Sequence, residues 1–149
     1  HSNWLPPPTR GPAMKSIVIS RAPKCMCFHI QRRYYDAAAD RMVKSAQIVA
    51  FSEIIDIAPF CAYTSRGSSM HMRLMSIIEH RGNAHAGHYV AYRRIRRSSD
   101  CWIVVSDDHV SAVSWDEVRR SQAYMLIYEA ASWLGELKSM TSFLCYCTS

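Results

Sequence analysis

The sequence predicts an α+β fold that consists mainly of an antiparallel β-sheet and contains little helix. Short apolar runs, rich in β-branched and aromatic residues, recur between turn-forming residues along the central part of the chain. The connections between these runs are mostly tight, which favours antiparallel neighbours. Only one segment carries a clear helix start signal. We therefore expect the helical complement of this sheet to lie in sequence outside the chain.

The composition predicts one domain flanked by two less regular segments. The chain has 149 residues, 49% of them hydrophobic, which is enough for one core. Residues 1–15 hold four of the six prolines and are expected to be a linker or truncated loop. Residues 16–130 form the predicted domain, and residues 131–149 receive no firm structure. Because the chain begins with His1 and contains no apolar run of about 20 residues, we expect an excised, soluble piece without a membrane segment.

The apolar runs predict about six or seven short strands among eight candidate segments. The run from Met70 to His80 is apolar at both odd and even positions, which is typical of a strand covered on both faces. Ser114 and Glu117 form a capping box, so a short helix is expected to begin there. Residues 32–48 are left open between a short helix and an irregular crossing. The candidate segments are residues 17–19, 25–30, 54–57, 70–80, 89–95, 102–105, 110–113 and 123–128.

Charge and cysteine content narrow the class of protein. The net charge of +6 could suit a polyanion, and Arg93, Arg94, Arg96 and Arg97 concentrate part of it. No aromatic residues are interleaved with these arginines, so we interpret them as a solvated strand end and expect no nucleic-acid partner. The six cysteines fit neither a paired zinc pattern nor a secreted disulfide framework, which favours reduced thiols in an intracellular protein.

One histidine stands where chemistry is expected. His88 directly follows Gly87 at the mouth of a predicted strand, where a glycine leaves room for a substrate to approach the backbone. Ser106 ends another predicted strand eighteen positions later. Adjacent antiparallel strands would bring its hydroxyl beside the imidazole and hold the ring of a general base in one tautomer and orientation.

The neighbouring histidines raise the question of a metal. His80, His85 and His88 have an HxxxxHxxH spacing, and imidazole is a common zinc ligand. The three residues straddle a predicted loop, and no fourth ligand accompanies them. We therefore expect no metal and no cofactor.

Several blocks of sequence share their order with a known family. They are APKCMCFHIQR (22–32), VAFSEIIDIAPF (49–60), GHYVAY (87–92), and the closing segments WIVVSDDHV (102–110) and AYMLIYE (123–129). This order resembles the C-terminal half of the catalytic domain of ubiquitin-specific proteases. The resemblance implies the palm sheet of a papain-like cysteine protease that cleaves after the C-terminal glycine of ubiquitin in conjugates.

The resemblance implies roles for individual residues. His88 would act as general base toward a cysteine thiol and later protonate the leaving lysine amine. Gly82 and Gly87 would flank a loop that closes over a narrow channel for the diglycine end of ubiquitin, and Tyr89 would touch the substrate. Ubiquitin and ubiquitinated proteins are the implied partners.

Two acidic residues receive an open interpretation. Glu53 and Asp56 lie in the second matching block, and their carboxylates could pair with the arginines of the ubiquitin tail. A solvated surface position is the equal alternative for each of them.

Two departures from the family pattern matter. Ser106 stands where most members have Asp or Asn; the mitochondrial outer-membrane deubiquitinase resembles this chain in using serine, which suggests a cytosol-facing location at that membrane. Asp107 is the alternative orienter. The family's cysteine box is absent, and Cys25 and Cys27 lie in a predicted strand as ordinary small residues. The chain is thus expected to supply the base without the nucleophile, or, alternatively, to be a non-catalytic ubiquitin-binding module.

Overall fold

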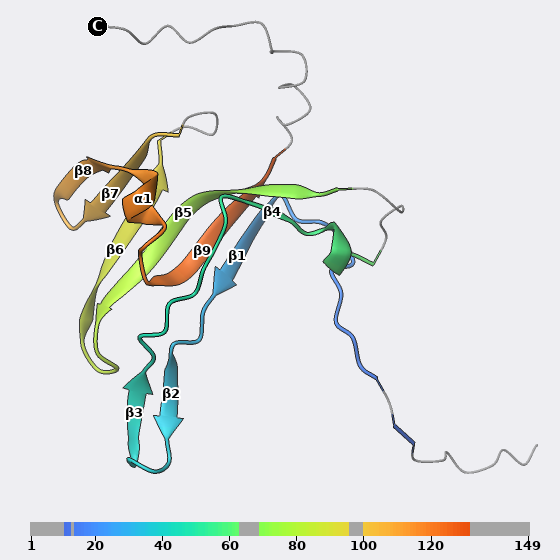
Figure 1. Cartoon of the computed structure of the whole chain (residues 1–149), viewed down its shortest axis with the longest axis horizontal. Coiled ribbons are helices and arrows are strands. Elements are labelled where there is room, and N and C mark those ends of the chain that lie inside the picture. Colours follow the sequence, from blue (N-terminus) through green and yellow to red (C-terminus); the bar gives the residue numbers. More distant parts are fainter. Residues whose placement is uncertain (1–10, 13, 63–68, 96–99, 132–149) are drawn as a thin grey trace, which may run out of the picture.

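The computed structural model describes residues 11, 12, 14–62, 69–95 and 100–131. Seven strands form one sheet in the order β1–β9–β5–β6–β7–β8, with the short β4 also paired to β5, and every pairing is antiparallel (Figure 1). The predicted fold class is therefore confirmed. The bounds are β1 Cys25–His29, β4 Ile54–Asp56, β5 His71–Gly82, β6 Gly87–Arg94, β7 Trp102–Ser106, β8 His109–Val113 and β9 Ala123–Ala130.

The described helical content is small. α1 (Trp115–Val118) follows Ser114, whose hydroxyl accepts a hydrogen bond from the backbone N–H of Glu117 at 3.2 Å, as expected for the serine of a capping box. The 3₁₀ turn η1 (Ala58–Phe60) follows β4 and contains the predicted Pro59 stop. Neither described helix reaches membrane-spanning length.

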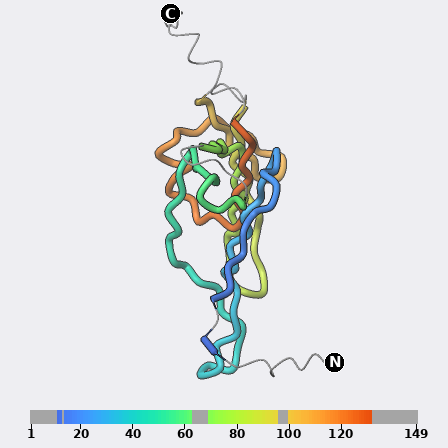
Figure 2. The backbone as a smooth tube through the Cα atoms, turned by 90° about the vertical axis from the view of Figure 1, so that its right-hand side faces the viewer, coloured from blue at the N-terminus to red at the C-terminus, as the bar shows by residue number. Residues whose placement is uncertain are grey.

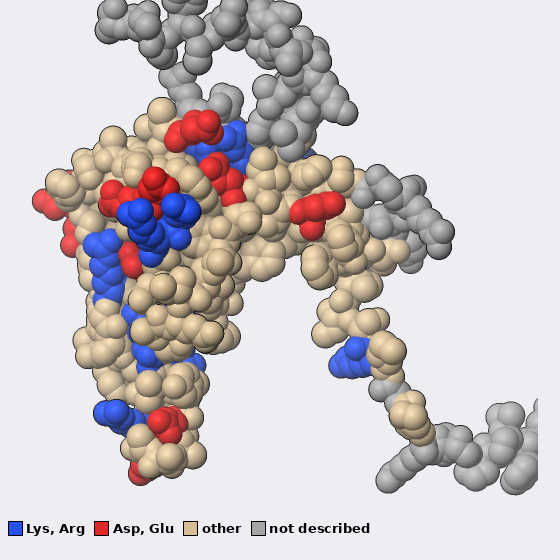
Figure 3. Space-filling model, in the orientation of Figure 1, with Lys and Arg blue, Asp and Glu red and all other residues tan. Residues whose placement is uncertain are grey.

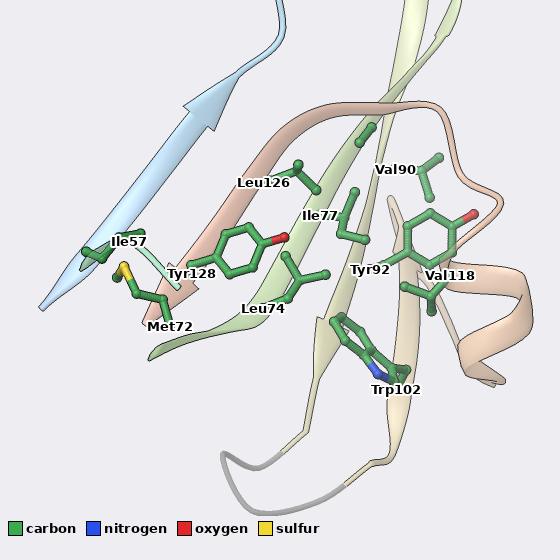
Figure 4. Close-up of a cluster of buried hydrophobic side chains, with 11 residues drawn as sticks. Ile57, Met72, Leu74, Ile77, Val90, Tyr92, Trp102, Val118, Leu126 and Tyr128 are labelled. Atoms are coloured by element: carbon green, nitrogen blue, oxygen red, sulfur yellow. The ribbon is translucent and has the colours of Figure 1, made fainter. Parts of the chain in front are cut away.

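The core lies on one face of the sheet, and α1 covers part of it (Figure 4). Trp102 from β7 and Trp115 from α1 stack at a tilt, with ring centroids 5.8 Å apart. The apolar runs of β5, β6, β7 and β9 bury side chains here, which stabilises the sheet by removing apolar surface from water. The cluster consists of Ile57, Met72, Leu74, Ile77, Val90, Tyr92, Trp102, Val118, Ala123, Leu126 and Tyr128.

Residues 45–53 run along one side of the sheet on their way to β4 (Figure 2). Buried Arg32 anchors the start of this segment, because its guanidinium donates to the main-chain oxygens of Gln47 and Ala123 at 2.7 and 2.8 Å. The hydroxyl of Tyr128 donates to the Ser52 oxygen at 2.7 Å near its end. These polar contacts fix a connection that has no regular structure of its own.

The interpretation of residues 32–48 was wrong in both alternatives, because the segment contains a β-hairpin. β2 (Arg33–Asp36) pairs with β3 (Arg41–Lys44). The Asp36 carboxylate accepts from two backbone N–H groups in the turn, and Asp40 takes a positive φ of 48°. Such side-chain capping and left-handed geometry are typical of aspartate in turns.

The strand predicted at residues 17–19 is absent. Only Ile19 forms an isolated bridge, to Cys61, while Ile17 and Val18 are exposed. An apolar triplet becomes a strand only where a partner edge extends along it, and a single bridge does not provide one.

Some predictions fall on residues outside the described ranges. These are most of the proline-rich segment 1–15, Arg96 and Arg97 of the basic run, and the tail from residue 132 onward. On the visible face of the described part, acidic and basic side chains are interspersed (Figure 3).

Candidate active site

His88 lies at the end of the β5–β6 hairpin, on the face of the sheet that carries the core. Side chains alternate along a strand, so His88 shares its face with buried Val90 and Tyr92 of β6. The side chain of His88 is 41% exposed. An incoming group can therefore reach the imidazole, whereas the side chains of Val90 and Tyr92 on the same face are buried.

The imidazole of His88 lies between two polar side chains. Its Nε2 is 2.7 Å from the Oγ of Ser106, and its Nδ1 is 3.8 Å from a carboxylate oxygen of Asp107. The contact with Ser106 is a hydrogen bond, whereas the distance to Asp107 is too long for one. Both predicted orienters thus flank the ring, with the hydroxyl in direct contact and the highly exposed carboxylate at a distance.

The β7–β8 turn explains why both residues reach the same ring. β7 runs beside β6 up to the pair Ala91–Val105, and Ser106 pairs with His109 across a two-residue turn. Asp107 takes a positive φ of 51° in that turn, which aspartate tolerates. The tight turn places Asp107 immediately beyond Ser106 and beside the imidazole.

The turn between β5 and β6 depends on its two glycines. Gly82 and Gly87 face each other at the end of the ladder, and Gly82 has a φ of +132°, a region open only to glycine. A Cβ at Gly87 would lie 2.3 Å from Nε2 of His80. The Asn83 side chain closes the turn by accepting from the backbone N–H groups of His85 and Ala86 at 2.8 and 2.9 Å.

A pocket of about 310 Å³ lies against this turn on the opposite face of the sheet from His88. Tyr89 is 56% exposed there, and the centroid of its ring lies 4.9 Å from that of the His80 ring and 5.8 Å from that of the Tyr124 ring. Burial and the nearby Lys44 and Arg33 lower the pKa of His80, which favours the neutral ring. The pocket is lined by Arg33, His80, Ala84, His85, Ala86, Gly87, Tyr89 and Tyr124.

A second pocket, of about 430 Å³, lies between β3 and the same turn. Lys44 of β3 donates to the main-chain oxygens of His80 and Gly82 at 2.5 and 2.9 Å, so it ties the β2–β3 hairpin to the end of β5. Burial, followed by the nearby Arg32, lowers the pKa of Lys44. The two pockets share Ala84 and His85 and therefore meet at the turn before His88.

A group of polar side chains around Arg81 lies on the same face of the sheet as His88. Arg81, the cross-strand partner of His88, donates from Nε to Glu79 and from Nη2 to the Tyr92 hydroxyl, each at 3.0 Å. The other oxygen of Glu79 accepts from the backbone N–H of Gln122 at 3.0 Å. Burial, followed by Glu79, raises the pKa of Tyr92, so the phenol stays protonated.

The sequence profile described as "UCH: Ubiquitin carboxyl-terminal hydrolase" matches residues 10–128, most of the chain. The chain belongs to the ubiquitin carboxyl-terminal hydrolase family. Its mainly antiparallel strands match a fragment of a papain-like domain, and the relatives that it matches are named ubiquitin carboxyl-terminal hydrolases.

The relatives that match this chain are longer proteins. It is 31% identical to ubiquitin carboxyl-terminal hydrolase 16 of Mus musculus over 144 residues, covering 78% of the chain and 17% of that protein. It is 36% identical to ubiquitin carboxyl-terminal hydrolase 1 of Arabidopsis thaliana over 129 residues, covering 78% of the chain and 12% of that protein. The chain thus spans less than a fifth of the length of these relatives.

A solved structure supports the fold. A chain of the SAGA Ubp8/Sgf11/Sus1/Sgf73 DUB module bound to ubiquitin aldehyde superposes with a TM-score of 0.71 at 23% identity. The match covers 77% of this chain and 26% of that one. At this identity the likeness concerns the arrangement of strands.

The two cysteines of β1 lie away from His88. Cys27 of β1 is exposed. It pairs with Ile127 of β9, which pairs with Ser76 of β5, and Ser76 pairs with Arg93 of β6, five residues from His88. With about 4.8 Å per strand and about 3.3 Å per residue, the two backbones lie roughly 20 Å apart. Cys25 lies two pairs further from His88 along β1, so neither strand cysteine reaches the imidazole.

Glu53 and Asp56 also lie apart from His88. The backbone oxygen of Glu53 pairs with Leu74, seven residues along β5 from the partner of His88, which corresponds to about 23 Å. Its carboxylate contacts buried Arg94. The Asp56 carboxylate accepts from two backbone N–H groups, which lowers its pKa. Their predicted pairing with ubiquitin arginines remains a prediction.

Sequence reasoning missed Arg81, Lys44 and Tyr124 as neighbours of the site. Tyr124 is the extra residue of a β-bulge, since Ile78 pairs with Met125 and Glu79 with Ala123, and the bulge turns its ring toward His80. No local pattern announces a bulge. Arg81 could have been found, because it is equally far from the turn as His88. Within the described residues, no three His, Cys, Asp or Glu side chains are arranged to hold a metal ion.

Proposed function

We propose that this chain supplies the general base and its orienting residue to a thiol isopeptidase that hydrolyses the bond after the C-terminal glycine of ubiquitin. One observation carries the proposal: the half-exposed imidazole of His88 is held at 2.7 Å by Ser106. The cysteine nucleophile comes from a segment outside the described residues. We call the polypeptide that joins this chain to that segment the parent polypeptide, of which this chain is the C-terminal part of the catalytic domain.

The chemistry follows from the two ring nitrogens of His88. When Nε2 carries the ring proton and donates a hydrogen bond to Ser106 Oγ, Nδ1 keeps a lone pair that can accept a proton. Nδ1 takes the proton of the cysteine thiol, and the thiolate attacks the glycine carbonyl. The imidazolium then returns that proton to the leaving lysine amine, and water hydrolyses the remaining thioester with the same base.

Ser106 and Asp107 divide the work of the usual acidic residue. The neutral hydroxyl of Ser106 fixes the ring but does not offset the charge of an imidazolium as a carboxylate would. The Asp107 carboxylate, 3.8 Å from Nδ1, supplies negative charge without a direct hydrogen bond. Because Asp107 is highly exposed, solvent screens this interaction and makes it the weaker of the two.

The ubiquitin terminus is proposed to approach along the β5–β6 turn. Gly82 and Gly87 keep the backbone thin there, and Tyr89 lines the neighbouring pocket. An extended peptide covers about 3.3 Å per residue, so a point 23 Å from His88 lies about seven residues from the scissile glycine. Glu53 and Asp56 are therefore proposed to meet ubiquitin beyond its last few residues.

Two measurements test the proposal. A ubiquitin probe with a cysteine-reactive C-terminus should label the parent polypeptide and leave the isolated chain unlabelled. Turnover of a ubiquitin-fluorophore by the parent should fall more in Ser106→Ala than in Asp107→Ala, and His88→Ala should abolish it. Labelling of the isolated chain would contradict the missing nucleophile, and the reverse order of the two variants would reassign the orienter.

The second candidate function is a non-catalytic ubiquitin-binding module. The observation that favours it is the distance of roughly 20 Å between His88 and the exposed strand cysteine Cys27. This alternative predicts that the parent polypeptide binds ubiquitin but stays unlabelled by the probe.

The proposed location is intracellular and cytosol-facing, with the mitochondrial outer membrane suggested by the serine at position 106. A tagged parent polypeptide, imaged beside an outer-membrane marker, tests this location.

A further inference from the structure

Arg81 presents a fixed positive charge beside the proposed general base. It pairs directly with His88 across the β5–β6 ladder, and their side chains project from the same face of the sheet. The Cβ atoms of such pairs lie about 5 Å apart. Ser106 and Asp107 approach the imidazole from β7, on the opposite flank. His88 thus lies between a cation on the β5 side and a carboxylate on the β7 side.

The guanidinium of Arg81 is held in place. Its Nε donates to Glu79 and its Nη2 to the Tyr92 hydroxyl, each at 3.0 Å. Glu79 is itself fixed by the Gln122 backbone N–H, and Tyr92 is 3% exposed. An arginine held in this way loses less side-chain entropy when it binds a partner than a free surface arginine does.

The exposed end of this ion pair is the cation. The side chain of Arg81 is 55% exposed, whereas that of Glu79 is 11% exposed. A guanidinium has five N–H donors, of which two are used here, so three have no acceptor among the described residues. Two free N–H groups of one guanidinium match the two oxygens of a carboxylate.

We propose that Arg81 binds an acidic side chain next to the modified lysine of the ubiquitin conjugate. This inference rests on the proposed function, because His88 must protonate the leaving lysine amine and therefore lies against the residues that flank it. The pocket lined by Tyr89 is on the opposite face of the sheet, so the ubiquitin terminus leaves Arg81 free for the leaving group. Conjugates with Asp or Glu beside the lysine are then cleaved faster than those with Lys or Arg there.

The test compares ubiquitin joined by an isopeptide bond to peptides that differ only in the residues beside the lysine: acidic, neutral or basic. The unmodified parent polypeptide should cleave the acidic conjugate about threefold faster than the basic one, as expected for one exposed, preorganised ion pair. The ratio should fall toward one in Arg81→Gln and as salt is raised. Arg93→Gln is the matched control, because Arg93 is an exposed arginine of β6 on the opposite face.

Several outcomes overturn the inference. One is an acidic preference that survives in Arg81→Gln or disappears equally in Arg93→Gln. Another is a more than twofold loss of ubiquitin-fluorophore turnover in Arg81→Gln, since that substrate has no flanking residues and a loss would place Arg81 in the catalytic step itself. A parent polypeptide that fails to cleave the ubiquitin-fluorophore at all refutes the proposed function, which separates the two failures.

The carboxylate that Arg81 binds has a second conceivable source, the new C-terminus of product ubiquitin. Inhibition by free ubiquitin is therefore compared with inhibition by ubiquitin carrying a C-terminal amide. If the ratio of inhibition by free ubiquitin to inhibition by the amide is the same for the parent polypeptide and its Arg81→Gln variant, the flanking acid is supported as the partner of Arg81. If Arg81→Gln weakens only the inhibition by free ubiquitin and keeps the flank preference, the inference is wrong.

Discussion

Replacement of Gly87 by alanine tests whether the backbone before His88 must be free of a side chain. A Cβ at this position would lie 2.4 Å from the main-chain oxygen of Arg81 and 2.3 Å from Nε2 of His80. Ordinary contacts of a Cβ atom begin near 3.4 Å. The imidazole of His80 can rotate away, but the Arg81 oxygen belongs to the ladder that pairs β5 with β6.

Relief of this overlap requires the end of the hairpin to open by about 1 Å, and overpacking of this kind costs about 1–3 kcal/mol. The same movement shifts His88, the next residue. A misplacement of about 1 Å in a catalytic group lowers turnover by about 100-fold. Gly87→Ala in the parent polypeptide should therefore lose about 1–3 kcal/mol of unfolding free energy in urea and most of its ubiquitin-fluorophore turnover.

Two further variants sharpen this test. Gly11→Ala is the control, because nothing lies within 4 Å of a Cβ at that position. The double variant His80→Ala, Gly87→Ala removes the side-chain overlap and keeps the main-chain one, so it should not restore turnover. The reasoning is refuted if Gly87→Ala stays within about 0.5 kcal/mol and twofold of the unmodified protein, or if the double variant recovers fully.

Three other predictions concern contacts around the site and the core. Glu53→Gln should destabilise the parent by about 2 kcal/mol in urea, because it leaves the buried Arg94 guanidinium with less compensating charge, and an unchanged midpoint would contradict this. Burial raises the pKa of Tyr128 to about 12. The stabilisation from the protonated phenol is therefore complete below about pH 10 and is lost as pH rises from there toward 12. Tyr128→Phe, which also loses the hydrogen bond to the Ser52 oxygen, should show a shallower loss of unfolding free energy between pH 8 and pH 11. Lys44→Met should cost about 1 kcal/mol and lower turnover, since it removes two hydrogen bonds to main-chain oxygens at the end of β5, whereas unaltered turnover would separate the β2–β3 hairpin from the site.

Local sequence was sufficient for the strands that carry their own signals. The run at Met70–His80, apolar at both parities, forms the central β5, which pairs with β4, β6 and β9. Ser114 caps α1 as its hydroxyl and the glutamate three residues on predicted. These features depend only on residues that are close in sequence, so they can be predicted without knowledge of the tertiary structure.

The sequence also determined that His88 and Ser106 would meet, because His88 lies at the start of one strand and Ser106 at the end of the next, and antiparallel neighbours bring these two ends together. Long-range register decided the rest. Tyr124 reaches His80 only through a bulge in β9, and Arg32 crosses to residues 45–47 and to Ala123. Such contacts join residues far apart in sequence, and their energy appears only once the strands are aligned, so no local pattern encodes them.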